Sequence, residues 1–149
     1  MEHLLGKKQE ELNRIFREFD DLYHSVSVNC GLSDSAFDIL YCVGEMGEGC
    51  RQKDICLYFY TSKQTLHSAI RKLEQDGILE LVSGKGRDKH IYLTEKGRSI
   101  LEDKILPVMR AENAAFSKMS EEESEQLLNL TWKYMSFLKQ NLCSKDEEQ

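Results

Sequence analysis

The sequence contains a single convincing pair of β-strands, which restricts the folds that the chain can adopt. Residues 79–82 and 89–93 alternate between apolar and polar side chains, and the segment 83–88 separates them. Alternation with a period of two is typical of a strand that buries one face, so the two stretches predict one β-hairpin. Its buried face would carry Leu79, Leu81, Ile91 and Leu93. Elsewhere the apolar residues recur at the three-and-four spacing of helices, which predicts a mostly α-helical fold with one small hairpin.

Four helices are predicted before the hairpin. The first covers about residues 4–29 and ends near Gly31, and the second is capped by Ser33 or Asp34 and stops at Gly47. A short polar helix follows at about 51–58, and a fourth helix at 62–75. Residues 61–64 have the form of a capping box, with Thr61 as the N-cap of the fourth helix and Gln64 reaching back.

Two helices are predicted after the hairpin. Thr94 caps a long helix that should bend at Pro107, because proline lacks the amide donor and crowds the preceding turn. Residues 120–123, Ser-Glu-Glu-Glu, form a second capping box that starts the last helix. The remaining residues, 144–149, are predicted to be a charged tail.

The order of these elements is that of a winged helix-turn-helix with an additional helical region at each end. At 149 residues the chain suits one domain, which we place at residues 1–143. Its winged core covers about 33–97, and the helices at about 4–29 and 95–142 flank it. The apolar stripes of these outer helices exceed what one small winged domain can cover, so we interpret them as dimerisation helices of a homodimer.

The charge of the chain is divided unevenly along the sequence. Residues 49–98 contain ten Lys and Arg against six Asp and Glu, a charge of +4, whereas the two flanks together carry −10 and the whole chain −6. A basic middle between acidic flanks indicates one anion-facing region and a remainder that does not touch nucleic acid.

The fourth helix has the polar face that a DNA recognition helix requires. If Leu66, Ile70 and Leu73 face the core, the outward side chains from 62 to 72 contain no acid. Donors on the first turns can bond base edges in the major groove, and cations there can face phosphate. An ordinary surface helix is the alternative, but its outer face would normally include Glu or Asp. The predicted DNA-binding residues on this helix are Ser62, Lys63, Gln64, Thr65, His67, Ser68 and Arg71.

The tip of the hairpin is a second candidate contact with DNA. Lys85, Arg87 and Lys89 lie in or beside a glycine-containing loop that has no apolar anchor. Such a loop can follow a phosphate backbone or enter a minor groove, where arginine is favoured electrostatically. A solvated turn is the alternative interpretation for this segment.

Three stretches resemble the MarR family of bacterial transcriptional regulators: 51–55 (Arg-Gln-Lys-Asp-Ile), 61–78, and 91–97, which ends in Leu-Thr-Glu-Lys-Gly. The resemblance extends over nearly the whole chain, because the order and lengths of the helices also match. It implies a homodimer that binds a pseudo-palindromic operator, with Arg87 at the minor groove. Many members carry Asp two residues before that arginine, where this chain has Lys85. Either Asp88 substitutes for the missing acid, or the wing is looser.

The resemblance also implies that a signal acting on the dimer releases DNA, as for a repressor controlled by a small molecule, metal or oxidant. The sequence offers Cys30 as a redox sensor, with a packed cysteine as the alternative. Tyr23, His24 and Trp132 are candidates for a ligand cavity, although aromatic residues at helical spacing are usually core residues. No cofactor is predicted, and the histidines have no metal-ligand spacing.

The cysteines favour a reducing compartment. They show no Cys-x-x-Cys pair and are odd in number, which argues against a disulfide framework: Cys30, Cys42, Cys50, Cys56 and Cys143. The sequence also shows neither a membrane-spanning apolar run nor a secretory signal, so we expect a cytoplasmic protein without membrane contact.

Two other function classes are possible for a chain of this kind. A winged helix can serve as a protein–protein assembly module without binding DNA, but such a module should present an apolar or acidic outer face on the fourth helix. An enzyme is not predicted, because the sequence has no phosphate-binding glycine loop after a strand, no paired catalytic carboxylates and no metal cluster. The sequence therefore favours a sequence-specific DNA-binding regulator.

Overall fold

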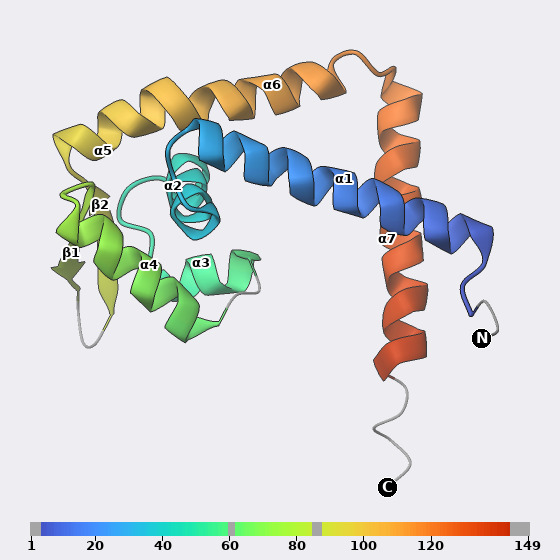
Figure 1. The fold of residues 1–149 in the computed structure, drawn as a ribbon, viewed down its shortest axis with the longest axis horizontal. Helices are drawn as coiled ribbons and strands as arrows, with labels where there is room; N and C mark the ends of the chain where they lie inside the picture. The colour runs from blue at the N-terminus through green and yellow to red at the C-terminus, as the bar shows by residue number, and fades with distance from the viewer. Residues whose placement is uncertain (1–3, 60–61, 85–87, 144–149) are drawn as a thin grey trace, which may run out of the picture. The chain divides into compact units, whose positions relative to one another are not determined.

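The computed structural model describes residues 4–59, 62–84 and 88–143. It divides into two compact units, Met1–Pro107 and Val108–Gln149, and we describe each by itself. The predicted single domain, residues 1–143, is therefore still a prediction. Figure 1 shows the order of the elements along the chain.

The fold is mostly α-helical with one two-stranded antiparallel sheet, as the sequence predicts. The elements are α1 (Lys7–Asn29), α2 (Asp34–Met46), α3 (Gln52–Phe59), α4 (Lys63–Gln75), β1 (Leu79–Ser83), β2 (Lys89–Leu93), α5 (Glu95–Ile100), the π-helical turn η1 (Leu101–Ile105), α6 (Leu106–Phe116) and α7 (Glu121–Cys143). The hairpin pairs Leu79 with Leu93 and Leu81 with Ile91, which is the predicted shared face.

Several predicted helix caps are confirmed. The Ser33 hydroxyl accepts a hydrogen bond from the Ala36 amide at the start of α2. Before α7, the Ser120 and Glu123 side chains each accept a hydrogen bond from the other residue's main-chain amide, at 3.2 and 2.8 Å. The ends of α2 and α4 are followed by Gly47 and Gly77, both with positive φ. Such local rules work because a cap satisfies amides that the first helical turn leaves unpaired.

The predicted cap of α4 is wrong by one residue. Ser62, not Thr61, is the N-cap, and its hydroxyl accepts a hydrogen bond from the Thr65 amide at 3.1 Å. Thr61 itself lies outside the described residues. Both residues are good caps, so the local pattern fits either start of the helix, and α4 begins one residue later than the box predicts.

Pro107 perturbs the long helix in a specific way. Directly before it, η1 takes the place of an α-helical turn, and the Leu106 amide bonds to the Leu101 carbonyl, five residues back. Proline has no amide hydrogen, and its ring crowds the carbonyl four residues earlier. A wider turn relieves that crowding, which accounts for the π-helical segment on the N-terminal side of Pro107. The predicted bend stays a prediction.

The core of the first unit lies among α2, α3, α4, η1 and the hairpin. The fully buried apolar residues include Ile39, Leu40, Ile55, Ile70, Leu73, Leu79, Ile91, Leu93 and Ile105. In the second unit, no residue of α7 is buried. The winged core therefore has the packed interior that can hold α4 and the hairpin in fixed positions.

Gly97 lies in α5, where this helix contacts Ile78 in the segment between α4 and β1. A Cβ built on Gly97 would come within 2.0 Å of the Ile78 carbonyl oxygen. The Thr94 hydroxyl donates to the Gly77 carbonyl at 2.7 Å and accepts from the Gly97 amide at 3.1 Å. The Leu-Thr-Glu-Lys-Gly stretch therefore holds α5 against residues 77–78 through the Thr94 hydroxyl. The close contact leaves no room for a side chain at Gly97.

Within the described ranges, none of the helices combines the length and the apolar character needed to cross a membrane.

Candidate nucleic-acid interface

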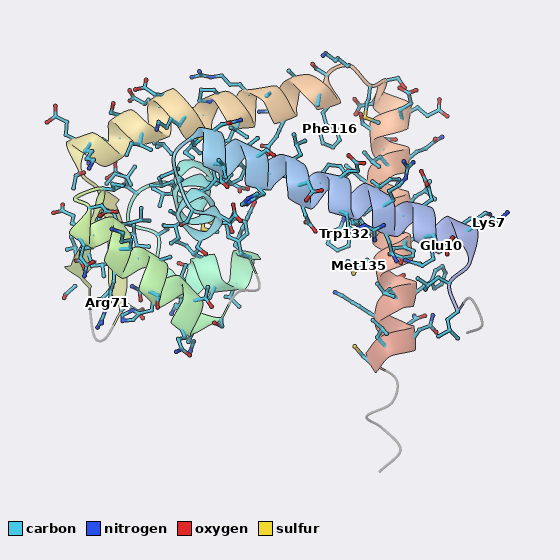
Figure 2. The ribbon with its side chains drawn as sticks, viewed as in Figure 1. Lys7, Glu10, Arg71, Phe116, Trp132 and Met135 are labelled. Carbon is cyan, nitrogen blue, oxygen red and sulfur yellow. The ribbon has the colours of Figure 1, made fainter. Side chains whose placement is uncertain are left out.

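The face of α4 is arranged as the sequence predicts. Leu66, Ile70 and Leu73 are buried against the core. Every predicted DNA-binding residue of this helix region is exposed: Ser62, Lys63, Gln64, Thr65, His67, Ser68 and Arg71. Figure 2 shows Arg71 projecting outward from α4. The physical reason is the 100° rotation per helical residue, which turns these side chains away from the apolar stripe once that stripe is packed.

The polar residues on this face fall into two groups. The hydroxyls of Ser62 and Thr65 lie 2.8 Å apart, and the Ser68 hydroxyl donates to the Gln64 carbonyl at 3.0 Å. Within the described parts of the chain, the side chains of Gln64, His67 and Arg71 have no hydrogen-bond or ion-pair partner. These three side chains are therefore available to an external ligand, whereas the hydroxyls already contribute to the helix start.

The base of the hairpin is fixed to the segment between α2 and α3. The Ile91 amide donates to the Cys50 carbonyl at 2.9 Å, the Gly49 amide donates to the Ile91 carbonyl at 2.7 Å, and His90 Nδ1 lies 2.7 Å from the Gly49 carbonyl oxygen. Arg51 forms an isolated β-bridge with His90. This third, short extended segment anchors the strands and so restricts where the wing can lie.

Charged side chains connect the wing with the start of α3. Asp88 Oδ2 lies 3.5 Å from Lys53 Nζ and 3.8 Å from Arg51 Nη1. Arg51 also forms a two-point contact with Asp54, at 2.9 and 2.8 Å, and this hydrogen bonding lowers the pKa of the Asp54 carboxyl. Asp88 thus braces the base of the wing against α3. Arg51 and Lys53 are not among the predicted DNA-binding residues, although both belong to the Arg-Gln-Lys-Asp-Ile stretch at 51–55, which was the available signal.

The predicted wing residues are described only in part. Lys89 begins β2 and is exposed. Lys85 and Arg87 lie outside the described residues, so their role stays a prediction.

The fold and part of the sequence match known proteins. Residues 31–88 match the model of the MarR family. A MarR family regulator from Neisseria meningitidis has the same fold, with a TM-score of 0.80, 16% identity, and coverage of 95% of this chain and 100% of that one. The winged part of the chain is therefore similar to the MarR family, and the chain shares the fold of the structures compared. This confirms the resemblance that its sequence carries.

Further MarR-type structures show the same architecture. MepR of Staphylococcus aureus, solved as a complex with DNA, has a TM-score of 0.69 and 22% identity over 90% of this chain and 99% of that chain. A MarR transcriptional regulator from Methanosarcina mazei Go1 has a TM-score of 0.63 and 21% identity over 92% of this chain and 94% of that chain. No curated protein matches the chain in sequence. The MarR family and these structural neighbours are transcriptional regulators.

Two of the three residues proposed for a ligand cavity lie together in the structure. Tyr23 and His24 of α1 line a cavity of about 230 Å³ together with residues of α2. Trp132 belongs to α7, is 70% exposed and is not among the lining residues. Within the described residues, no group of three His, Cys, Asp or Glu side chains could hold a metal ion.

Two carboxylates of this cavity differ in their protonation behaviour. The Ser27 hydroxyl contacts Asp34 and His24 Nδ1 lies 2.9 Å from Asp34 Oδ2, and these contacts lower the pKa of the Asp34 carboxyl. Burial, with a smaller contribution from the charge of Asp34, raises the pKa of Asp38 to about 6. Asp20 and His24 of α1 line the same cavity.

We expect Asp38→Asn to stabilise the protein at pH 8 by about 1 kcal/mol, after allowance for partial solvent screening. The folded-state pKa of Asp38, about 6, lies above the ordinary aspartate value of 3.8. The charged form is therefore disfavoured in the fold, a penalty that is full above about pH 6 and disappears as the pH falls towards the unfolded-state pKa of about 3.9. Urea denaturation of parent and variant at pH 8 and pH 4 measures this. Asp34→Asn is the matched control: the pKa of Asp34 is lowered in the fold, so this change should decrease the free energy of unfolding at pH 8. An effect of Asp38→Asn on stability that does not depend on pH would contradict the prediction.

The cysteines differ in their surroundings. Burial raises the pKa of the Cys42 thiol to about 12 and also raises that of Cys50, so both stay protonated and unreactive at neutral pH. Cys30 is half-buried, with Lys104 Nζ donating to its main-chain carbonyl at 2.5 Å. Cys56 is also half-buried, and Cys143 is exposed. The redox role considered for Cys30 stays a prediction.

Proposed function

We propose that the protein is a cytoplasmic, sequence-specific DNA-binding regulator, acting as a homodimeric repressor that a small molecule or another signal releases from its operator. The observation that carries this proposal is the exposed face of α4. It holds three side chains, Gln64, His67 and Arg71, that have no partner among the described residues, and no acid between residues 62 and 72. An assembly module would need an apolar or acidic face there. The MepR structure, with 22% identity, was solved with DNA and supports the same reading of the fold.

The positions of these residues on α4 and the wing indicate which would contact bases and which would contact phosphate. With α4 in the major groove, Gln64 can bond an adenine at two points and Arg71 a guanine, while Ser62, Lys63 and Thr65 lie at the helix start, where phosphate is favoured. His67 and Ser68 complete the outward surface of the first turns. Lys85, Arg87 and Lys89 of the wing would contact the backbone or the adjacent minor groove.

Exposed apolar side chains support a homodimer. On α1, Phe16, Phe19 and Leu22 are 46, 55 and 58% exposed. On α7, Leu130 and Leu142 are 63 and 69% exposed. Exposed apolar surface of this extent marks interaction sites, and a two-fold dimer would bind a pseudo-palindrome with half-sites about 10 base pairs apart. The α1–α2 cavity beside Tyr23 and His24 is the proposed place for an effector.

The decisive test is the base preference of Gln64→Ala. Loss of one bidentate contact should reduce discrimination at one or two operator positions by about 1–3 kcal/mol and leave binding to scrambled duplex nearly unchanged. Selection from random duplexes followed by titration of the selected and scrambled DNA measures this. Gln75→Ala, at the far end of the same helix, is the matched control. A parent protein that binds selected and scrambled DNA equally well would contradict the proposed function.

A further inference from the structure

A cavity of about 250 Å³ lies where α3, α4 and the start of β2 meet, and four of its nine lining residues are Lys or Arg. Arg51 and Lys53 come from the region of α3, Lys63 and His67 from α4, and Lys89 from β2. Asp88 is its single acidic lining residue. Three separate elements therefore contribute positive charge to one concave surface, next to the outward face of α4.

The cations of this cavity are not equally neutralised. Arg51 is held by Asp54 at two points, and Asp88 lies near both Arg51 and Lys53. Within the described ranges of the chain, Lys63 and Lys89 have no ion-pair partner. A cleft with excess charge of one sign and low-dielectric walls focuses its field, so the cavity attracts an anion.

Gln52 adds an observation that is independent of charge. Gln52 is one of the lining residues, and its buried side-chain nitrogen has no hydrogen-bond partner among the described residues. Buried donors in native proteins are almost always paired, because an unpaired one loses its hydration without compensation. A bound oxygen acceptor would supply the missing partner of Gln52 Nε2.

We infer that this cavity is a phosphate site, in which the Gln52 amide donates to a phosphate oxygen while Lys53, Lys63 and Lys89 balance its charge. The inference rests on the proposed function in one respect: the nearest source of phosphate for a cavity beside His67 is the backbone of the DNA that α4 reads. A free phosphate ion offers the same chemistry. Asp88 lies 3.5 Å from Lys53, so a bound phosphate would compete with Asp88 for this lysine and weaken the contact between α3 and the base of the wing.

Two measurements on the full-length protein test the site. The first titrates inorganic phosphate into the ¹⁵N-labelled protein at low ionic strength and follows the Gln52 side-chain amide and the amides of residues 51–53. The second measures the affinity for cognate and scrambled duplex as a function of salt. The variants are Gln52→Met, which removes the donor at similar size, and Lys53→Gln, which removes one charge. Lys72→Gln, whose ammonium pairs with Asp76 outside the cavity, is the control with the same charge change.

We expect Gln52→Met to weaken phosphate binding about 10-fold and to weaken cognate and scrambled DNA by a common factor, because a backbone contact carries no sequence information. Lys53→Gln should also reduce the slope of log affinity against log salt by about one, whereas Lys72→Gln should not. Lys53 is exposed, so its variant keeps the test informative if Gln52→Met does not fold.

The outcomes separate the possible sources. Loss of phosphate binding with unchanged DNA affinity assigns the site to a free phosphate ion instead of the DNA backbone. Unchanged phosphate and DNA binding in both variants overturns the site, even if the parent protein selects its operator. A parent that shows no preference for cognate DNA overturns the proposed function, and the phosphate titration still decides whether the cavity binds phosphate.

Discussion

Replacing Gly97 with Ala should lower the free energy of unfolding by about 3 kcal/mol and the melting temperature by about 10 °C. The added Cβ would lie 2.0 Å from the Ile78 carbonyl oxygen and 3.3 Å from the Leu93 side chain. The nearest atom belongs to the backbone, so rotation of a side chain cannot relieve the contact. Either α5 moves away from residues 77–78, which breaks the Thr94 contacts, or the end of β2 shifts. Thermal and urea denaturation of the two proteins measure the loss.

Gly6→Ala is the matched control for this prediction. Gly6 is the N-cap of α1 with a φ of −76°, and a Cβ there meets nothing within 4 Å. This change should alter stability by no more than about 0.5 kcal/mol. If Gly97→Ala melts at the same temperature as Gly6→Ala, the close packing of α5 on Ile78 is wrong.

Replacing Phe19 with Glu should convert the proposed dimer into a monomer at micromolar concentration and weaken operator binding at least about 100-fold. Phe19 is 55% exposed on α1, so a carboxylate there stays hydrated in a single chain but loses water in an apolar interface. Once the chains separate, the second half-site is no longer bound at the high effective concentration that the first contact provides. Light scattering measures the mass, and titration with a duplex of one or two half-sites measures the affinity.

Arg17→Glu is the control for this change. Arg17 is exposed on α1, about half a helical turn away from the apolar stripe, and the variant adds a carboxylate of the same kind. It should leave the dimer intact. A monomeric parent protein at micromolar concentration would contradict the dimer, and a dimeric Phe19→Glu variant would place the interface away from this part of α1.

Local sequence patterns predicted much of the fold because they depend on residues three or four positions apart. The burial of Leu66, Ile70 and Leu73 fixed which side of α4 is exposed, and the Ser120–Glu123 box identified the start of α7. The same locality explains the error at the start of α4, where Thr61 and Ser62 satisfy one rule equally well. The π-helical form of η1 was also not predictable, since Pro107 forbids one hydrogen bond without dictating how the preceding turn adapts.

The sequence by itself determined the element order, the single hairpin and the acid-free face of α4, because helical and strand periodicities record which side chains a neighbouring core will bury. Only the tertiary structure decided which distant residues meet. Asp88 lies beside Lys53, Gly97 lies beside Ile78, and Gln52 lines a cavity with Lys63 and Lys89. None of these pairs has a spacing that repeats along the chain. Their proximity arises only when the hairpin packs against α3 and α5 docks behind it, and such long-range packing has no periodic signature in the sequence.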